Sequence, residues 1–69
     1  MTDYLTGAPA YLEFTGKGGD PIKGVYFVVD QDRYYIELRD EETIQIVSKR
    51  SIKVYEPDRM KWPKEFLPC

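Results

Sequence analysis

The sequence contains no histidine, and its only cysteine, Cys69, is the last of its 69 residues. A single cysteine excludes a disulfide within the chain and is typical of a protein from a reducing compartment. The usual nitrogen and sulfur ligands of a structural zinc are missing. Asp30 and Asp32 lack the further oxygen ligands of a calcium-binding loop. We therefore expect neither a metal site nor a cofactor.

Long apolar runs are also missing. The longest, residues 25–29, is far too short to cross a bilayer, and the N-terminus lacks the basic segment and apolar core of a signal peptide. These features predict a soluble, cytoplasmic protein without a membrane partner. Its net charge of -2 gives no overall attraction to nucleic acid, so any such binding must come from a local basic patch.

A chain this short forms one domain and buries only about 60% of the surface that its unfolded form exposes. Domains of this size usually gain stability from disulfides, a bound metal or a partner subunit. Because the composition argues against the first two, we expect oligomerisation to supply the additional buried surface.

Alternation of apolar and polar residues dominates the middle of the sequence and predicts β-strands. Four segments show it and are rich in β-branched or aromatic residues: "AYLEFT", "RYYIELR", "TIQIVS" and "SIKVYE". In the third of these, Ile44 and Ile46 form the apolar face. Residues 22–29 carry apolar side chains at both parities, which indicates a central strand covered on both faces. Gly24 inside this strand predicts a sharp bend.

Short turns rich in Gly, Asp and Ser separate these segments. Five short strands joined in this way predict an all-β fold, a small and strongly bent antiparallel barrel over residues 10–57. Residues 1–9 form an N-terminal arm with little or no helix, because they include Gly7 and Pro9. Residues 58–69 form a tail whose prolines forbid a long helix and allow a single turn near residues 58–62.

Catalysis has little support in the sequence. Without histidine, a serine, cysteine or metal-water mechanism lacks its usual base. The carboxylate pair Asp30 and Asp32 remains, but acidic residues in a tight turn are more often turn formers. The loop "GKGGD" lacks the GK[ST] ending and the following helix of a phosphate-binding loop. We expect a protein that is not an enzyme, with no catalytic residues and no small-molecule substrate.

Three cations, Lys49, Arg50 and Lys53, lie close together where the last two strands meet. Such a cluster often does no more than keep a sheet edge soluble. The adjacent Tyr34 and Tyr35 point to opposite faces of a strand, so one of them faces away from the core. Tyr34, next to the turn "DQDR", is the better candidate to stack on a base, and Tyr35 is better explained as a rim or interface residue.

Residues 11–57 resemble the Sm/LSm family, which includes bacterial Hfq. Gly24, Asp30 and "YYIEL" match the bent strand, the aspartate and the aliphatic strand of the first Sm motif, with Gly19 at the glycine of the preceding turn. Residues 31–34 stand where many members carry a base-contacting asparagine. "VSKRSIKV" resembles the second motif in its Hfq form, with Lys49 at the lysine, Arg50 at the histidine and Ser48 in place of the tyrosine. The chain also resembles small Sm-like proteins of marine phage origin.

This resemblance implies a homo-oligomeric ring of roughly five to seven subunits, a closed assembly in which edge strands of neighbours pair. The fourth strand of one subunit would pair with the fifth strand of the next. The interface side chains implied are Ile44, Ile46, Val47, Ile52, Val54 and Tyr55.

The same resemblance implies binding of RNA, or of single-stranded DNA, with a role in RNA or DNA processing. The turn between the last two strands would face the pore and repeat its charge around the ring, where phosphates attract cations and bases stack on aromatics. Lys49 and Arg50 would contact phosphate or base, and Tyr34 would stack. Gln31 and Arg33 would donate hydrogen bonds, and Asp30 belongs to the same motif.

Two other functions fit the sequence. A monomeric SH3-like or Tudor-like module would bind a peptide in a groove lined by Tyr34, Tyr35, Tyr55 and Trp62, and its acidic turns would favour a basic ligand. A structural ring component would assemble without affinity for nucleic acid, as the acidic balance of the chain allows.

Overall fold

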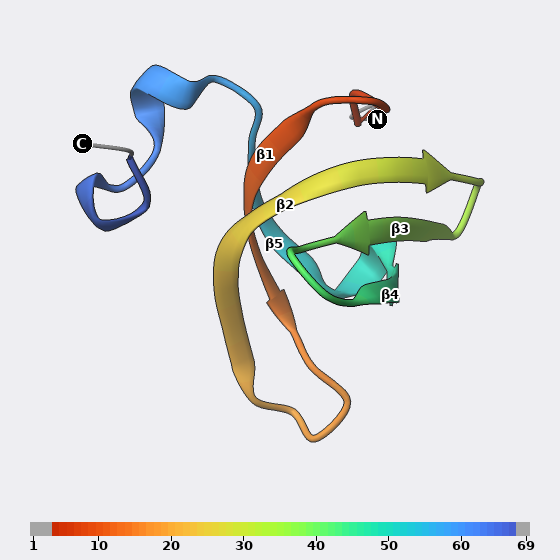
Figure 1. Cartoon of the computed structure of the whole chain (residues 1–69). Helices are drawn as coiled ribbons and strands as arrows, with labels where there is room; N and C mark the ends of the chain where they lie inside the picture. Colours follow the sequence, from red (N-terminus) through yellow and green to blue (C-terminus); the bar gives the residue numbers. More distant parts are fainter. Residues whose placement is uncertain (1–3, 68–69) are drawn as a thin grey trace.

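The segments with alternating apolar residues form strands, as predicted, in a computed structural model that describes residues 4–67 (Figure 1). The strands are β1 (Pro9–Thr15), β2 (Pro21–Gln31), β3 (Tyr35–Arg39), β4 (Ile44–Ser48) and β5 (Ile52–Glu56). Three short 3-10 helices complete the described chain: η1 (Lys49–Ser51), η2 (Arg59–Lys61) and η3 (Lys64–Phe66). No α-helix occurs in this part of the chain.

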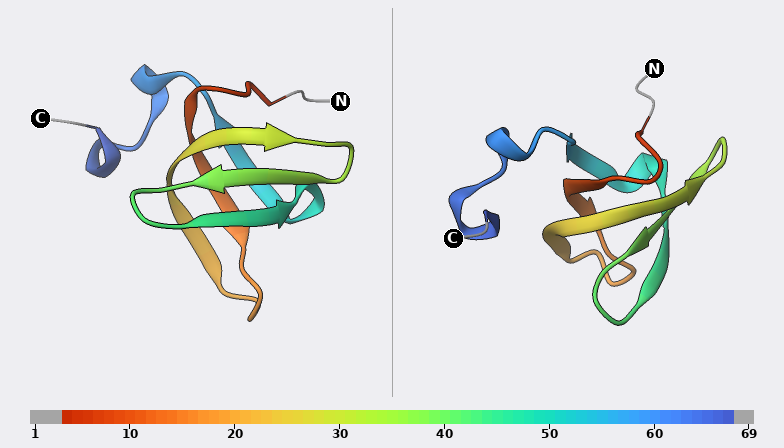
Figure 2. Two further views of the ribbon diagram at one scale, coloured as in Figure 1. Left: turned by 45° about the vertical axis from the view of Figure 1, so that its right-hand side comes forward. Right: turned by 45° about the horizontal axis from the view of Figure 1, so that its top comes forward.

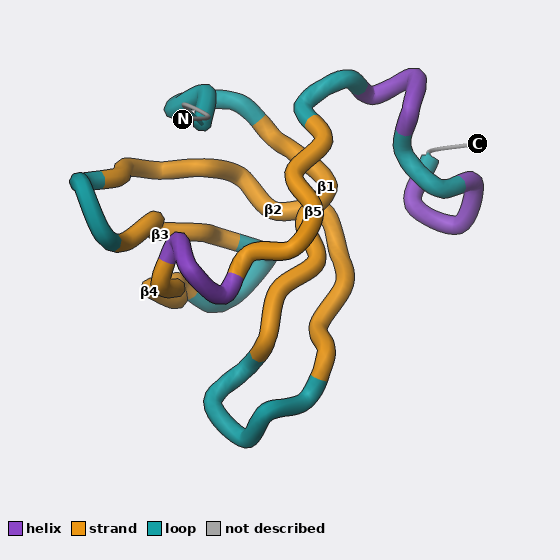
Figure 3. The backbone as a smooth tube through the Cα atoms, turned by 180° about the vertical axis from the view of Figure 1, so that it is seen from behind, coloured by secondary structure: helices purple, strands orange, loops and turns teal. Residues whose placement is uncertain are grey.

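The five strands form one antiparallel sheet in the order β4-β3-β2-β1-β5. The segment predicted to be central, β2, lies in the middle of this order. The prediction of a closed barrel is wrong, because β4 and β5 are the two edges of the sheet and do not pair with each other. The turn η1 redirects the chain after β4, so that β5 pairs with β1 instead (Figure 3). A closed barrel requires every strand to pair with a neighbour on both sides.

The central strand serves two parts of the sheet. Its first half pairs with β1 and its second half with β3, and Phe27 alone pairs with both, opposite Pro9 and Arg39. The two parts lie at an angle to each other (Figure 2). Gly24 is buried within the first half, where a Cβ would lie 3.2 Å from Cε2 of Tyr26. The missing side chain therefore lets the Tyr26 ring lie against its own strand.

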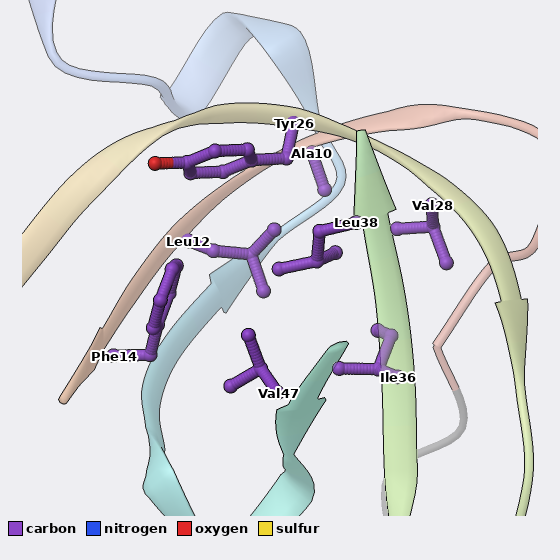
Figure 4. Close-up of a cluster of buried hydrophobic side chains, with 8 residues drawn as sticks. All are labelled: Ala10, Leu12, Phe14, Tyr26, Val28, Ile36, Leu38 and Val47. Atoms are coloured by element: carbon purple, nitrogen blue, oxygen red, sulfur yellow. The ribbon is translucent and has the colours of Figure 1, made fainter. Parts of the chain in front are cut away.

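The concave side of the bent sheet holds the core (Figure 4). Its buried side chains are Ala10, Leu12, Phe14, Tyr26, Val28, Ile36, Leu38 and Val47. Leu12, Val28, Ile36 and Leu38 are completely excluded from solvent, and four of the five strands contribute to the cluster. Alternation along β1 and β3 thus has the expected result, with one face of each strand in the core.

The fourth strand turns its predicted apolar face outward. Ile44 and Ile46 are 60% and 65% exposed, and Val47 contributes the core contact instead. The register explains this, because Val47 pairs with Ile36, whose side chain is already in the core. Residues of one parity share a face, so placing Val47 inside forces Ile44 and Ile46 outside.

The tail packs on its own sheet through two aromatic residues. Trp62 is buried, and its Nε1 donates a hydrogen bond of 2.9 Å to the carbonyl of Glu56. The ring of Phe66 lies 5.3 Å from that of Tyr11. The turn expected at residues 58–62 occurs as η2, whose amide at Met60 donates to the Asp58 carboxylate. No helix within residues 4–67 is long and apolar enough to cross a membrane.

Candidate nucleic-acid interface

Two turns that are distant in the sequence meet at one end of the sheet. The amide of Lys49 donates a hydrogen bond of 2.9 Å to the carbonyl of Tyr34, and Tyr35 pairs with Ser48. Together the turns surround a groove of about 420 Å³. Its lining residues are Arg33, Tyr34, Tyr35, Ser48, Lys49 and Arg50. The groove therefore combines three cationic side chains with two exposed tyrosine rings.

Asp32 builds the first of these turns. One oxygen of its carboxylate accepts hydrogen bonds of 2.8 Å from the amides of both Tyr34 and Tyr35. These amides, first that of Tyr35 and then that of Tyr34, hold the pKa of Asp32 below its ordinary value, and the charge of Lys49 acts in the same direction. The carboxylate thus fixes the backbone that carries Tyr34.

Ser48 builds the second turn. Its hydroxyl accepts a hydrogen bond from the amide of Arg50 at 3.3 Å, which caps the start of η1. The amide of Ile52 closes the same turn by donating to the carbonyl of Lys49. Ser48 therefore has a structural role in this turn, while Arg50 remains exposed.

Lys49 is half-buried, and its ammonium contacts two residues that do not line the groove. Its ammonium donates a hydrogen bond of 2.8 Å to Oε1 of Gln31 and lies 5.4 Å from the centroid of the Tyr4 ring. Gln31 also donates through Nε2 to the carbonyl of Tyr4 and, at 3.1 Å, to the hydroxyl of Thr6. Gln31 is thus directed toward the N-terminal arm and Lys49.

The structure brings together four of the six residues predicted to contact nucleic acid, namely Arg33, Tyr34, Lys49 and Arg50. Gln31 joins them through Lys49. Asp30 accepts a hydrogen bond from the amide of Gln31 and lines a separate hollow of about 120 Å³.

The residues predicted for a subunit interface divide into two groups. Ile44, Ile46 and Val54 are exposed on the two edge strands. Ile52 and Tyr55 are half-buried and pack against the core, and the side chain of Val47 lies inside it. The exposed trio is therefore the part of the predicted interface available to another molecule.

Negative charge gathers at the opposite end of β3 from the groove. The turn after this strand contains Asp40, Glu41 and Glu42, and the Asp40 carboxylate accepts hydrogen bonds from the amides of Glu42 and Thr43. These bonds, above all that from Thr43, lower the pKa of Asp40. Arg33, Lys49 and Arg50 thus lie with Asp32 at one end of β3, and three carboxylates lie in the turn at its other end.

Sequence reasoning did not assign Tyr4 to this site. Its contact with Lys49 depends on the path of the arm across the sheet, and no local pattern signals that path. The groove itself adds Tyr35, which the sequence favoured as a rim or interface residue, and Ser48, which had a signal in the turn motif.

Comparison with known proteins does not place the chain in a family. No family model matches the sequence, and no curated protein or solved structure matches it either. Within residues 4–67, no three carboxylate, histidine or cysteine side chains are placed to hold a metal ion. The function is therefore inferred from the groove and from the two sheet edges.

Proposed function

We propose that the protein is a non-catalytic, Sm-like ring that binds single-stranded nucleic acid, with RNA as the preferred ligand. The observation that carries this proposal is the groove in which the exposed Tyr34 ring meets Arg33, Lys49 and Arg50. Cations attract the phosphate backbone, and an exposed aromatic face stacks on an unpaired base. A single strand offers both groups, whereas a duplex hides its base faces.

Assembly into a ring is supported by the two free edges. Within residues 4–67 each edge strand pairs with one other strand, and together the edges expose the apolar side chains of Ile44, Ile46 and Val54. An unpaired, apolar edge readily adds another strand. Pairing β4 of one subunit with β5 of the next covers these side chains and repeats the groove around a central axis.

The aromatic residues of the alternative peptide-binding module do not form one groove. Trp62 is buried and hydrogen-bonded to the Glu56 carbonyl, and the Tyr55 ring packs edge-on against Tyr4 at 4.6 Å. Only Tyr34 and Tyr35 line the groove with the cations. The positive charge there also suits a phosphate backbone better than the basic peptide expected of that module.

The experiment compares two double variants that lose the same charge. Replacing Lys49 and Arg50 with Ala should weaken binding of a labelled oligouridine on the order of tenfold and flatten its dependence on salt concentration. Replacing Lys61 and Lys64, two exposed tail residues, with Ala should leave both quantities nearly unchanged. The same titration with oligodeoxythymidine compares DNA with RNA.

Equal affinity and equal salt dependence of the wild type and the Lys49, Arg50 variant would contradict the groove as the binding site. A ring that binds neither oligonucleotide would contradict the proposed function and favour a purely structural role.

A further inference from the structure

The N-terminal arm is fixed to the sheet beside the candidate site. The amide of Gly7 donates a hydrogen bond of 2.7 Å to the carbonyl of Val28, and the amide of Val28 donates one of 3.2 Å to the carbonyl of Ala8. Closer to the N-terminus, the amide of Leu5 donates to the hydroxyl of Tyr55 at 2.8 Å. Figure 1 shows the arm leading into β1 alongside the end of β2. These bonds place the first described residue, Tyr4, in a defined position.

Tyr4 contacts Lys49 both directly and through Gln31. The centroid of its ring lies 5.4 Å from the ammonium, and its carbonyl accepts a hydrogen bond from Gln31, which in turn accepts one from Lys49. The Tyr55 ring supports the Tyr4 ring from the side, at an interplanar angle of 85°. Burial and the neighbouring Tyr55 raise the pKa of Tyr4, so its ring presents a neutral phenol to the cation.

These contacts compete with a ligand in the groove for the same ammonium. An aromatic face and a neutral oxygen are weaker partners for a cation than a phosphate is. Lys49 lines the groove, and the observed contacts of its ammonium are with Gln31 at the end of β2 and with the Tyr4 ring of the arm. A phosphate in the groove would therefore meet an ammonium that is already in contact with Gln31 and Tyr4.

We infer that Tyr4 is a further positioning residue of the site, which holds Lys49 back from the groove and masks it from anionic ligands. That Tyr4 competes with RNA for the Lys49 ammonium rests on the proposed function, whereas the masking of Lys49 by Tyr4 does not. The arm thus lowers the affinity of the site while leaving Arg33 and Arg50 free to make the first contact with a ligand.

The first measurement needs no nucleic acid. The rate at which a small amine-reactive ester modifies Lys49 is measured by mass spectrometry, with exposed Lys53 of the same molecule as the internal reference. In Tyr4→Ala the rate at Lys49 should rise by roughly two- to fivefold, as expected for the loss of one partly exposed cation-π contact, with Lys53 unchanged. Tyr4→Phe keeps the ring over the ammonium and should restore the wild-type rate.

The second measurement is the affinity for labelled oligouridine. Tyr4→Ala should bind roughly two- to fivefold more tightly than the wild type, and Tyr4→Phe should bind like the wild type. Tyr4→Leu is the second variant if Tyr4→Ala does not fold, because leucine keeps an apolar contact with Tyr55 but has no aromatic face. Thermal unfolding of each variant identifies those that are folded.

Equal modification rates at Lys49 in the wild type and in a folded variant without the ring would overturn the inference, whatever the affinity for RNA. Faster modification combined with equal or weaker RNA binding would overturn the competition. Faster modification in a protein that binds no RNA in any variant would support the masking and contradict the proposed function instead.

Discussion

Individual side chains in the turns decide how the candidate site is built. Asp32 was considered in the sequence as one of a carboxylate pair, and the structure uses it to fix two backbone amides next to Tyr34. Ser48 similarly fixes η1 beneath Arg50. The backbone that carries Tyr34 and Arg50 is therefore fixed by the side chains of Asp32 and Ser48.

Asp32 should also make stability depend on acidic pH. The pKa of Asp32 in the folded chain is lowered from its ordinary value of 3.8. The stability that the charged carboxylate contributes is therefore complete above pH 3.8 and is lost as the pH falls through the pKa of the folded chain. Stability of the wild type should therefore fall more steeply on acidification below 3.8 than that of Asp32→Asn, in which nothing titrates at this position.

Urea unfolding at several acidic pH values measures this difference. Asp40 also has a lowered pKa, so Asp32→Asn should retain part of the slope. Glu41→Gln removes the same charge from an exposed turn residue and should keep the wild-type slope. An unchanged slope in Asp32→Asn would show that the two amide bonds do not favour the charged carboxylate.

At the scale of elements, the bend of β2 positions the site. The strand pairs with β1 before Phe27 and with β3 after it, and it leads directly into the turn that carries Arg33 and Tyr34. A bulge between Val28 and Asp30 alters the pairing once more before that turn. The direction in which the turn points therefore depends on the conformation of one strand.

Gly24→Ala should destabilise the protein by about 1–3 kcal/mol, because the added methyl group would press on the buried Tyr26 ring at 3.2 Å. Gly18→Ala is the matched control, since its Cβ would make only an ordinary contact of 3.5 Å, and it should change stability by no more than about 0.5 kcal/mol. Denaturant unfolding followed by the fluorescence of Trp62, the only tryptophan, measures both. Equal stabilities of the two variants would contradict the close packing of Tyr26 on Gly24.

At the scale of the whole molecule, the open sheet leaves two edges and the exposed apolar residues on them. Ile46 is 65% exposed on β4, so a lysine there changes the edge without disturbing the core. We expect light scattering to give the wild type a mass of several subunits that is insensitive to dilution, and Ile46→Lys a mass closer to the 8.1 kDa of one chain.

Met60→Lys places the same charge on an even more exposed apolar residue of the tail, and it should assemble like the wild type. A wild-type mass of one chain at every concentration would exclude the ring. A variant Ile46→Lys that assembles normally would place the subunit contact away from β4.

Local patterns in the sequence predicted the elements and part of the site. Alternation identified the strands, whereas Gly24 lies in regular pairing with Leu12 and the central strand changes partner at Phe27. The cluster of Lys49 and Arg50, together with the turn before Tyr34, gave most of the residues that line the groove. Each of these features depends on residues that are close in the chain, where periodicity and turn chemistry act directly.

Only the tertiary structure decided which face of each strand is buried and which edges remain open. Alternation places Ile44 and Ile46 on the same face of β4 but does not say whether that face is buried. The pairing of Val47 with Ile36 puts Val47 in the core and the two isoleucines outside. The open sheet and the contact between Tyr4 and Lys49 join residues that are far apart in sequence. Such contacts follow from the path of the whole chain, because residues far apart in sequence are brought together only when the strands between them pair and pack.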